Sequence, residues 1–138
     1  GRVVVDGCFG DFFCEKYGQI QDTPLTYQLK HGRCIEGSVS CDHDQLKQDF
    51  IEYTFGTDEN ARRLGEFAIG TNIGLTELIG NILQDEKFPG IHLALGNPYP
   101  DKTGADWHSD AHNDGLLRNP TIVVDGQTIM EAGTFVIA

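Results

Sequence analysis

Two short segments of the chain alternate between large apolar residues and small or metal-binding ones. Residues 66–70 read Glu-Phe-Ala-Ile-Gly, and residues 92–96 read His-Leu-Ala-Leu-Gly. Successive side chains of a strand point to opposite faces, so each segment predicts a strand with its large apolar residues on one face. The other face then carries one ligand-type residue beside alanine and glycine. These small residues leave room for a bulky occupant, such as a metal ion with its substrate.

A third alternation lies farther along the chain. Acidic and imidazole side chains occupy every second position from 106 to 114, namely Asp106, His108, Asp110, His112 and Asp114. We expect a strand over roughly residues 105–112, and in an extended chain these side chains share one face. That face would consist of oxygen and nitrogen donors alone.

The remaining β signals are apolar runs bounded by turn residues. They cover residues 2–5, 24–30, 33–39, 91–96, 121–124, 128–130 and 134–138. His31-Gly32 and Asp125-Gly126 separate neighbouring runs, and such residue pairs favour the tight turns of β-hairpins. We therefore expect two hairpins in addition to the strands described above.

Helical signals are fewer. Leu46, Phe50 and Tyr53 recur at helical spacing and predict a helix that runs to about residue 53. Ser40 or Asp42 can cap the start of this helix.

Two shorter helical segments are expected: one turn over residues 58–63, and a helix over residues 75–83 with Thr76 as its cap. The predicted fold class is α+β, a β-rich domain of mostly antiparallel strands with two or three short helices.

The composition indicates one globular domain, residues 1–138, with a core of its own. The formal charge of −11 arises from 21 acidic and 10 basic residues. Because binding to a phosphate backbone needs Lys/Arg clusters, we expect no nucleic-acid partner. No apolar run is long enough to span a membrane and no signal-peptide pattern stands at the start, so we expect no membrane partner and a cytoplasmic protein.

Four cysteines are present, namely Cys8, Cys14, Cys34 and Cys41. Their spacing does not match that of common zinc sites, and we expect free thiols.

Two histidines and two carboxylates on separate strands suit a divalent transition metal, because imidazole favours Zn, Fe, Co or Ni over Ca or Mg. A two-ion site needs a carboxylate that bridges the ions. A mononuclear non-haem iron site needs two His and one carboxylate, and His92, His112 and Asp114 would supply that set. His108 and Asp110 repeat the His-x-Asp pattern two residues earlier and are the less favoured pair.

Several motifs between residues 62 and 126 resemble one family. They are Leu64-Gly65-Glu66, Asp85-Glu86-Lys87, His92-x-Ala94-Leu95-Gly96, Tyr99, Ser109-x-x-His112-x-Asp114 and Val124-Asp125-Gly126. Together they resemble the C-terminal metal-binding domain of the aminopeptidase T family of metallopeptidases (family M29). The resemblance implies that Glu66 bridges two metal ions and that Tyr99 lies at the metal centre. It also implies three further metal ligands, namely His92, His112 and Asp114.

A hydroxypyridine ring-cleaving dioxygenase is similar to the same family. It holds iron with two His and one Asp, which would be His92, His112 and Asp114 here. Compared with the peptidases, this chain has Lys87 where they usually have asparagine. They also carry another metal-binding glutamate, N-terminal to the matched part. Because the chain starts at Gly1 without Met and stops within an apolar run, we expect an excised piece of a longer protein, with weak or single metal binding and little activity alone.

The expected function is that of a metal-dependent aminopeptidase-type hydrolase with Zn, Co or Mn, in which a metal-bound hydroxide attacks a peptide bond at a two-ion site. Glu86 would be a general base or part of a solvated turn, and Tyr99 would stabilise an oxyanion or be a plain loop aromatic. The alternatives are an Fe(II)-dependent ring-cleaving dioxygenase and a non-catalytic metal-binding domain. The expected partner is a peptide or small-molecule substrate, with a homodimer left open.

Overall fold

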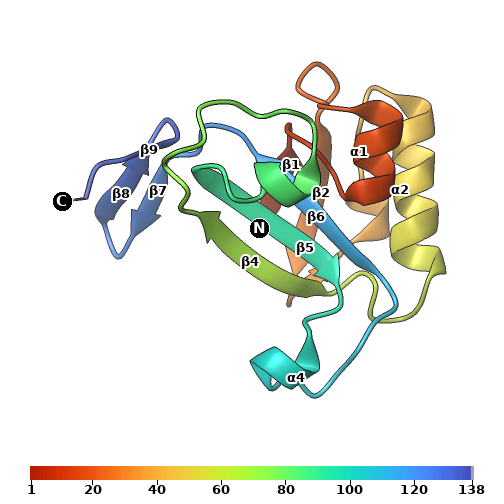
Figure 1. The fold of residues 1–138 in the computed structure, drawn as a ribbon. Helices are drawn as coiled ribbons and strands as arrows, with labels where there is room; N and C mark the ends of the chain where they lie inside the picture. The colour runs from red at the N-terminus through yellow and green to blue at the C-terminus, as the bar shows by residue number, and fades with distance from the viewer. Residues whose placement is uncertain (138) are drawn as a thin grey trace.

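The chain folds into three small sheets, shown in Figure 1 for the computed structural model, which describes residues 1–137. The strand orders are β1-β2-β3, β4-β5-β6 and β7-β8-β9, and the pairs within each sheet are antiparallel. The strands are β1 (Arg2–Val5), β2 (Leu25–Lys30), β3 (Arg33–Cys34), β4 (Leu64–Gly70), β5 (Gly90–Gly96), β6 (His112–Leu117), β7 (Ile122–Val124), β8 (Gln127–Glu131) and β9 (Thr134–Phe135).

The helices of the described residues are short, except for one. They are α1 (Asp11–Tyr17), α2 (Asp44–Gly56), α3 (Ile82–Asp85) and α4 (Pro100–Thr103), with a 3₁₀ turn η1 (Glu36–Ser38). The α+β, β-rich fold class predicted from the sequence is confirmed.

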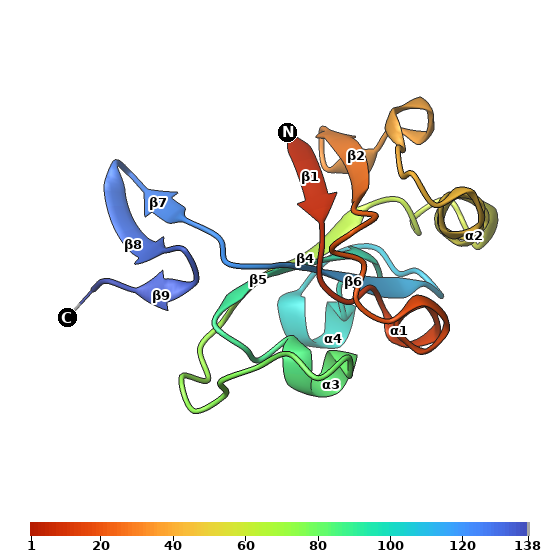
Figure 2. The same cartoon turned by 90° about the horizontal axis from the view of Figure 1, so that it is seen from above.

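The apolar core lies on one face of the β4-β5-β6 sheet. Leu93 and Leu95 of β5 point to this face and belong to the same buried cluster as Val5, Phe9 and Phe50. Figure 2 shows this sheet nearly edge-on, with β1, β2 and α2 on the core side and α3 and α4 on the opposite side. The core therefore closes one face of the sheet, and only short helices and loops border the other.

The alternation predicted for β4 and β5 is present, but the two strands bury their apolar side chains unequally. Leu93 is 6% exposed, whereas its partner in the ladder, Phe67, is 59% exposed. The difference arises because β4 is an edge strand, while β5 lies between two neighbours.

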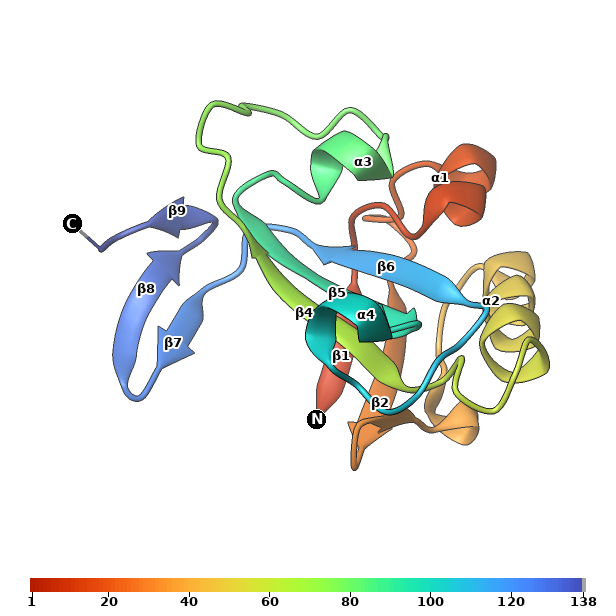
Figure 3. The same ribbon diagram turned by 60° about the horizontal axis from the view of Figure 1, so that its bottom comes forward.

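The strand expected over residues 105–112 is wrong. These residues form a loop between α4 and β6, visible in Figure 3, and the strand begins only at His112. Side-chain hydrogen bonds hold the end of this loop, because Ser109 Oγ and the backbone N–H of Asp110 both contact the carboxylate of Asp58. The donors at positions 106–110 therefore do not share a sheet face with those at 112 and 114.

The helix expected over residues 75–83 is also wrong. The backbone N–H groups of Ile79 and Gly80 donate to the carboxylate of Asp85 rather than to helical carbonyls, and Gly80 has a φ of 78°. The helix that does form is α3, and its cap is Asn81 instead of Thr76.

Other boundaries differ for local reasons. The hairpin of β2 and β3 across His31-Gly32 forms as predicted, but β3 ends at Cys34. Ser38 Oγ accepts from the backbone N–H of Gln28 and donates to the carbonyl oxygen of Ile35, which closes the turn η1. Residues 58–63 form hydrogen-bonded turns and no helix.

The long helix α2 runs to Gly56, and the cap at its start is His43, whose Nδ1 accepts from Leu46, rather than Ser40 or Asp42. No pattern in the sequence predicted α1, whose Phe13 is nevertheless buried in the core.

The last three strands form a small separate arm, visible at the left of Figure 1. The hairpin between β7 and β8 is confirmed, and positive φ at Asp125 and Gly126 gives the tight turn that the sequence predicted. Of the strand expected over residues 134–138, β9 covers Thr134–Phe135, and Ala138 lies outside the described residues. Among residues 1–137, no helix has both the length and the apolar character that a membrane crossing requires.

Candidate metal centre

A bulge in β4 determines which face Glu66 occupies. Leu64 pairs with Leu95 and Glu66 with Ala94, so one extra residue, Gly65, stands opposite a single step of β5. In a regular ladder Gly65 would pair with Ala94 and Glu66 with Leu93, so Glu66 would point into the core, because a shift of one position moves a side chain to the other face. A Cβ at Gly65 would overlap the carbonyl oxygen of Gly96, so only glycine lets the two strands approach here.

Across the sheet, Glu66, Ala94 and Asp114 form one row, with the alanine in the middle. His92 lies one row away along β5, and His112 one row away in the opposite direction along β6. The four ligand-type side chains thus surround Ala94, whose methyl group is the floor between them. The alternation in the sequence predicted this small residue among the ligand-type side chains, and Ala94 itself is fully buried beneath them.

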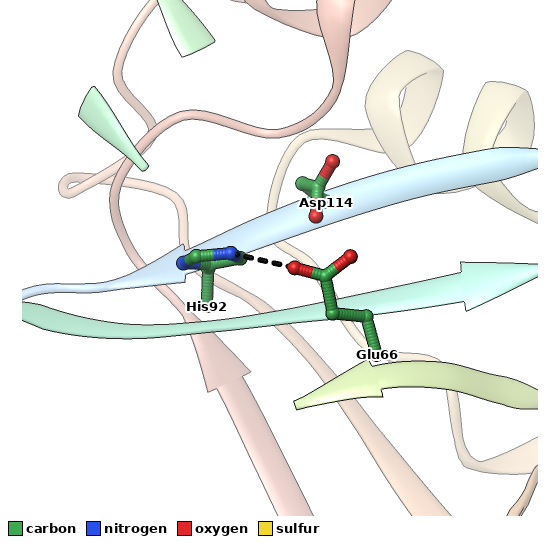
Figure 4. Close-up of side chains that lie close together, drawn as sticks. All are labelled: Glu66, His92 and Asp114. Carbon is green, nitrogen blue, oxygen red and sulfur yellow. Dashed lines mark hydrogen bonds and ion pairs between the residues drawn. The ribbon is translucent and has the colours of Figure 1, made fainter. Parts of the chain in front are cut away.

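The carboxylate of Glu66 lies between the two imidazoles. Its Oε1 is 3.0 Å from His92 Nε2, and its Oε2 is 3.6 Å from His112 Nε2. Asp114 Oδ2 in turn is 3.2 Å from His112 Nε2. Figure 4 shows Glu66, His92 and Asp114 pointing toward one another from β4, β5 and β6. Potential ligand atoms of these three side chains all lie within 4.8 Å of one another.

The second nitrogen of His112 defines its tautomer. His112 Nδ1 lies 2.8 Å from the carbonyl oxygen of Asn97, which can only accept, so Nδ1 carries a proton. Nε2 therefore faces the two carboxylates as the potential ligand atom. Burial opposes a charge on this ring, but the hydrogen bond and charge of Asp114 and the charge of Glu66 raise the pKa of His112 above its ordinary value. The proton that charges the ring binds to Nε2, and a bound cation would take the place of this proton.

Asp114 has a buried oxygen without a partner. Its Oδ1 makes no hydrogen bond, although such an atom in a protein interior normally has one. A cation between Asp114, Glu66 and His92 would satisfy it. The donor set of two imidazoles and two carboxylates also matches the ligands of zinc and similar ions, so the residues fit a divalent transition metal.

A cleft of about 840 Å³ opens above these side chains. Residues in α1, α3 and α4 or directly next to them form its walls, including Asp11, Ile82, Glu86, Tyr99 and Lys102. Asp11 belongs to none of the motifs in the sequence, yet the N–H of Gly10 donates to the carbonyl oxygen of Asp114 and fixes α1 at this edge. No pattern in the sequence revealed that contact, because it joins residues about 100 positions apart.

Tyr99 occupies a strained position beside the cluster. Its φ is 53°, uncommon for a residue with a side chain, and its ring lies 4.8 Å from that of His112. Partial burial, followed by the charges of Asp114 and Glu66, raises the pKa of Tyr99 above its ordinary value. The phenol therefore keeps its proton at neutral pH and can donate a hydrogen bond.

Glu86 lies at the end of α3 and faces the same cleft, where it pairs with Lys87 at 2.8 Å. His108 and Asp110 lie elsewhere: they are 3.9 Å from each other, and their side chains are 64% and 83% exposed. The structure thus brings Glu66 together with His92, His112 and Asp114. It separates His108 and Asp110 from this cluster.

Comparisons with known proteins show the family and the fold of the chain. Curated protein sequences give no match to the chain. Among solved structures, 2,5-dihydroxypyridine dioxygenase from Pseudomonas putida is similar, with a TM-score of 0.72 and 18% identity. The alignment covers 100% of this chain and 40% of that one, so the chain spans less than half the length of its structural relative. The family model for thermophilic metalloproteases (M29) matches residues 20–130. The chain therefore belongs to the thermophilic metalloprotease family M29.

Proposed function

We propose that this chain forms the metal-binding part of an aminopeptidase-type hydrolase that uses two divalent ions. The observation that carries the proposal is the position of Glu66, whose two carboxylate oxygens face two different imidazoles, those of His92 and His112. A carboxylate placed in this way is suited to bridge two ions. His92 would hold one ion, and His112 with Asp114 the other.

When bound, such ions supply Lewis acidity and lower the pKa of a bound water toward neutrality. The protein's own contribution is to orient the donors. Asn97 keeps Nδ1 of His112 protonated, so Nε2 is directed at the cluster. The small side chain of Ala94 lies buried between the donors, and the bulge at Gly65 turns Glu66 toward the cleft.

Two residues of the cleft wall are proposed to act on the substrate. The protonated phenol of Tyr99 would donate a hydrogen bond to the oxygen on which negative charge develops. Glu86 would accept a proton and pass it to the leaving amine. Lys87 holds the Glu86 carboxylate by an ion pair at the surface, where it remains accessible from the cleft.

The test is metal-dependent peptide cleavage without oxygen. We expect the complete protein that contains this chain, loaded with Zn, Co or Mn, to release N-terminal residues from small peptides under anaerobic conditions, and this chain alone to show little activity. The variant Glu66→Gln keeps the side chain's shape but loses the bridging charge, and it should be inactive. Asp110→Asn is the matched control, because it also removes one carboxylate but lies outside the cleft, and it should retain activity.

The second candidate is an Fe(II)-dependent ring-cleaving dioxygenase. It is supported by the presence of two imidazoles and Asp114 in one cluster, the set that a mononuclear iron site requires, and by the fold shared with a dihydroxypyridine dioxygenase. Oxygen-dependent loss of a dihydroxypyridine chromophore with Fe(II), together with no peptide cleavage under any metal, would reverse the order of the two candidates. Metal binding with neither activity would favour a non-catalytic domain.

A further inference from the structure

Two buried thiols lie directly behind the wall of the cleft. The Sγ atoms of Cys8 and Cys14 are 2.6 Å apart, and both residues are free cysteines with less than a tenth of their surface exposed. Cys8 is held against β6, where its carbonyl oxygen accepts from Leu116, and Cys14 lies on α1. The two sulfurs therefore come from separate parts of the backbone and meet in a fixed place.

The separation of the sulfurs argues against a shared metal ion. Two thiolates on one tetrahedral zinc, each about 2.3 Å from the ion, would stand about 3.8 Å apart. A disulfide bond has a length of about 2.05 Å, so a movement of roughly half an ångström would join Cys8 to Cys14. The pair is much closer to the geometry of a disulfide than to that of a metal site.

Both thiols contact the segment that carries α3. Cys8 Sγ lies 3.4 Å from Oδ2 of Asp85, and Cys14 Sγ lies 3.1 Å from the carbonyl oxygen of Gly80. Asp85 is 2% exposed and also accepts from the N–H groups of Ile79 and Gly80. Among the described residues no cation pairs with it, and the Cys8 thiol is the side-chain donor that contacts its carboxylate.

Cys14 can be reached from the surface. It lines a shallow pocket of about 340 Å³ together with Asp11, Asn81 and Leu83. A small oxidant such as hydrogen peroxide fits that space, whereas a larger reagent would be excluded from the deeper Cys8. The two thiols thus differ in access, as the two partners of a stepwise oxidation must.

We propose that Cys8 and Cys14 form a redox-active pair that peroxide converts to a disulfide. Peroxide oxidises the Cys14 thiol to a sulfenic acid and is itself reduced to water. Cys8 then attacks the Cys14 sulfur, Asp85 takes up the Cys8 proton, and hydroxide leaves and recovers that proton as a second water. Two thiols and one peroxide give one disulfide and two waters.

The disulfide would act on the cleft wall, independently of the reaction that the cleft catalyses. Once both S–H groups are gone, Gly80 and Asp85 each lose a potential donor. The segment from Ile79 to Asp85 leads directly into Glu86 and also carries Ile82, and both of these residues line the cleft. We therefore expect the wall to loosen in the oxidised protein.

Mass spectrometry tests the proposal on the full chain. After treatment with hydrogen peroxide, the protein should lose the mass of two hydrogen atoms, and digestion should yield a peptide that links Cys8 to Cys14. The double variant Cys34→Ser/Cys41→Ser should show the same loss, whereas Cys8→Ser and Cys14→Ser should not. Hydrogen exchange over residues 79–87 should then be faster by at least about threefold in the oxidised protein.

Three outcomes would overturn the proposal. The first is that both thiols remain fully alkylatable after oxidation and unfolding. The second is that Cys14 gains two oxygen atoms as a sulfinic acid without joining Cys8. The third is that the isolated protein releases zinc when its thiols are blocked, which would identify a metal site. A disulfide that forms without faster exchange over residues 79–87 would disprove the coupling to the cleft.

Discussion

The hydroxyl of Ser109 lies 2.9 Å from Oδ2 of Asp58, across 51 residues of the chain. Asp110 donates its backbone N–H to the same carboxylate, and Ala111 donates to the Ser109 hydroxyl. Burial works against the charge of Asp58, but the donors from Asp110 and Ser109 hold the pKa of Asp58 below its ordinary value. The backbone directly before β6 is thus fixed, and with it the position from which His112 enters the cleft.

Removal of that hydroxyl should weaken both the fold and the site. We expect Ser109→Ala to lower the free energy of unfolding by about 1 kcal/mol, because Asp58 loses a partly buried hydrogen bond. Metal affinity should fall by about tenfold, since the ligand His112 is positioned less firmly. Urea denaturation and calorimetric metal titration measure the two effects. The exposed Ser40→Ala is the control, and a Ser109→Ala protein with unchanged metal affinity would show that the loop does not position the ligand.

The bulge in β4 should tolerate no side chain at Gly65. A methyl group there would overlap the carbonyl oxygen of Gly96, so Gly65→Ala should cost at least about 2 kcal/mol or shift the register of β4. A shift would turn Glu66 away from the cleft and abolish metal binding. Gly56→Ala is the matched control, because a Cβ at Gly56 meets no atom within 4 Å. Thermal unfolding and metal titration of both variants check this, and equal behaviour would refute the role of the bulge.

A larger residue at position 94 should block the site without removing a ligand. Ala94 is fully buried between Glu66 and Asp114, so a leucine there would fill the space in which an ion must lie. We expect Ala94→Leu to fold with a loss of about 1–3 kcal/mol and to bind no metal, whereas Ala94→Ser should bind it. Circular dichroism establishes the fold and calorimetry the binding. Retained metal affinity in Ala94→Leu would mean that the ion lies elsewhere.

This chain alone should bind one ion tightly, and the second ion of the proposed site should bind more weakly. Four donors from the described residues surround the site, and a tetrahedral ion uses four, so a second ion would lack ligands. Zinc at about 100 times its dissociation constant should add about 2.7 kcal/mol to the free energy of unfolding. Glu66→Gln should lose most of this gain, and elemental analysis after gel filtration gives the stoichiometry. Two zinc ions per chain would contradict the prediction.

Because of Asp49, the free energy of unfolding should depend on pH in the acid range. Hydrogen bonds from Lys16, Tyr17 and Gln45 lower the pKa of Asp49 to about 2 and link α1 to α2. A carboxyl group with a lowered pKa in the folded state stabilises the fold above its unfolded pKa of about 3.9 and loses this contribution as the pH falls toward 2.

We therefore expect Asp49→Asn to be less stable than the natural chain at about pH 6, by about 1 kcal/mol after allowance for solvent screening. The difference should shrink between about pH 4 and pH 2. Melting curves across this range measure it, with the exposed Asp22→Asn as the control. A difference that stays constant with pH would rule out the ionised carboxylate as its source.

The sequence by itself determined which residues share a face with each ligand within β4 and β5. Alternation is a local property, because neighbouring side chains of a strand must point in opposite directions, and Ala94 and Gly96 could be placed beside His92 on that basis. Turn chemistry was equally local, and the hairpin at Asp125-Gly126 followed from the positive φ values that these residues tolerate.

Only the tertiary structure decided where β6 begins and which residues from other segments lie beside each ligand-type side chain of the cleft. The alternation from Asp106 to Asp114 was uniform, but the contact of Ser109 with Asp58 holds its first half in a loop. The approach of Asp114 to Glu66 depends on the pairing of β6 with β5. The position of Asp11 in the cleft wall depends on the contact of Gly10 with β6. Periodicity fixes the direction of a side chain relative to its own backbone, whereas the choice of partner arises from packing between distant segments, which no local pattern encodes.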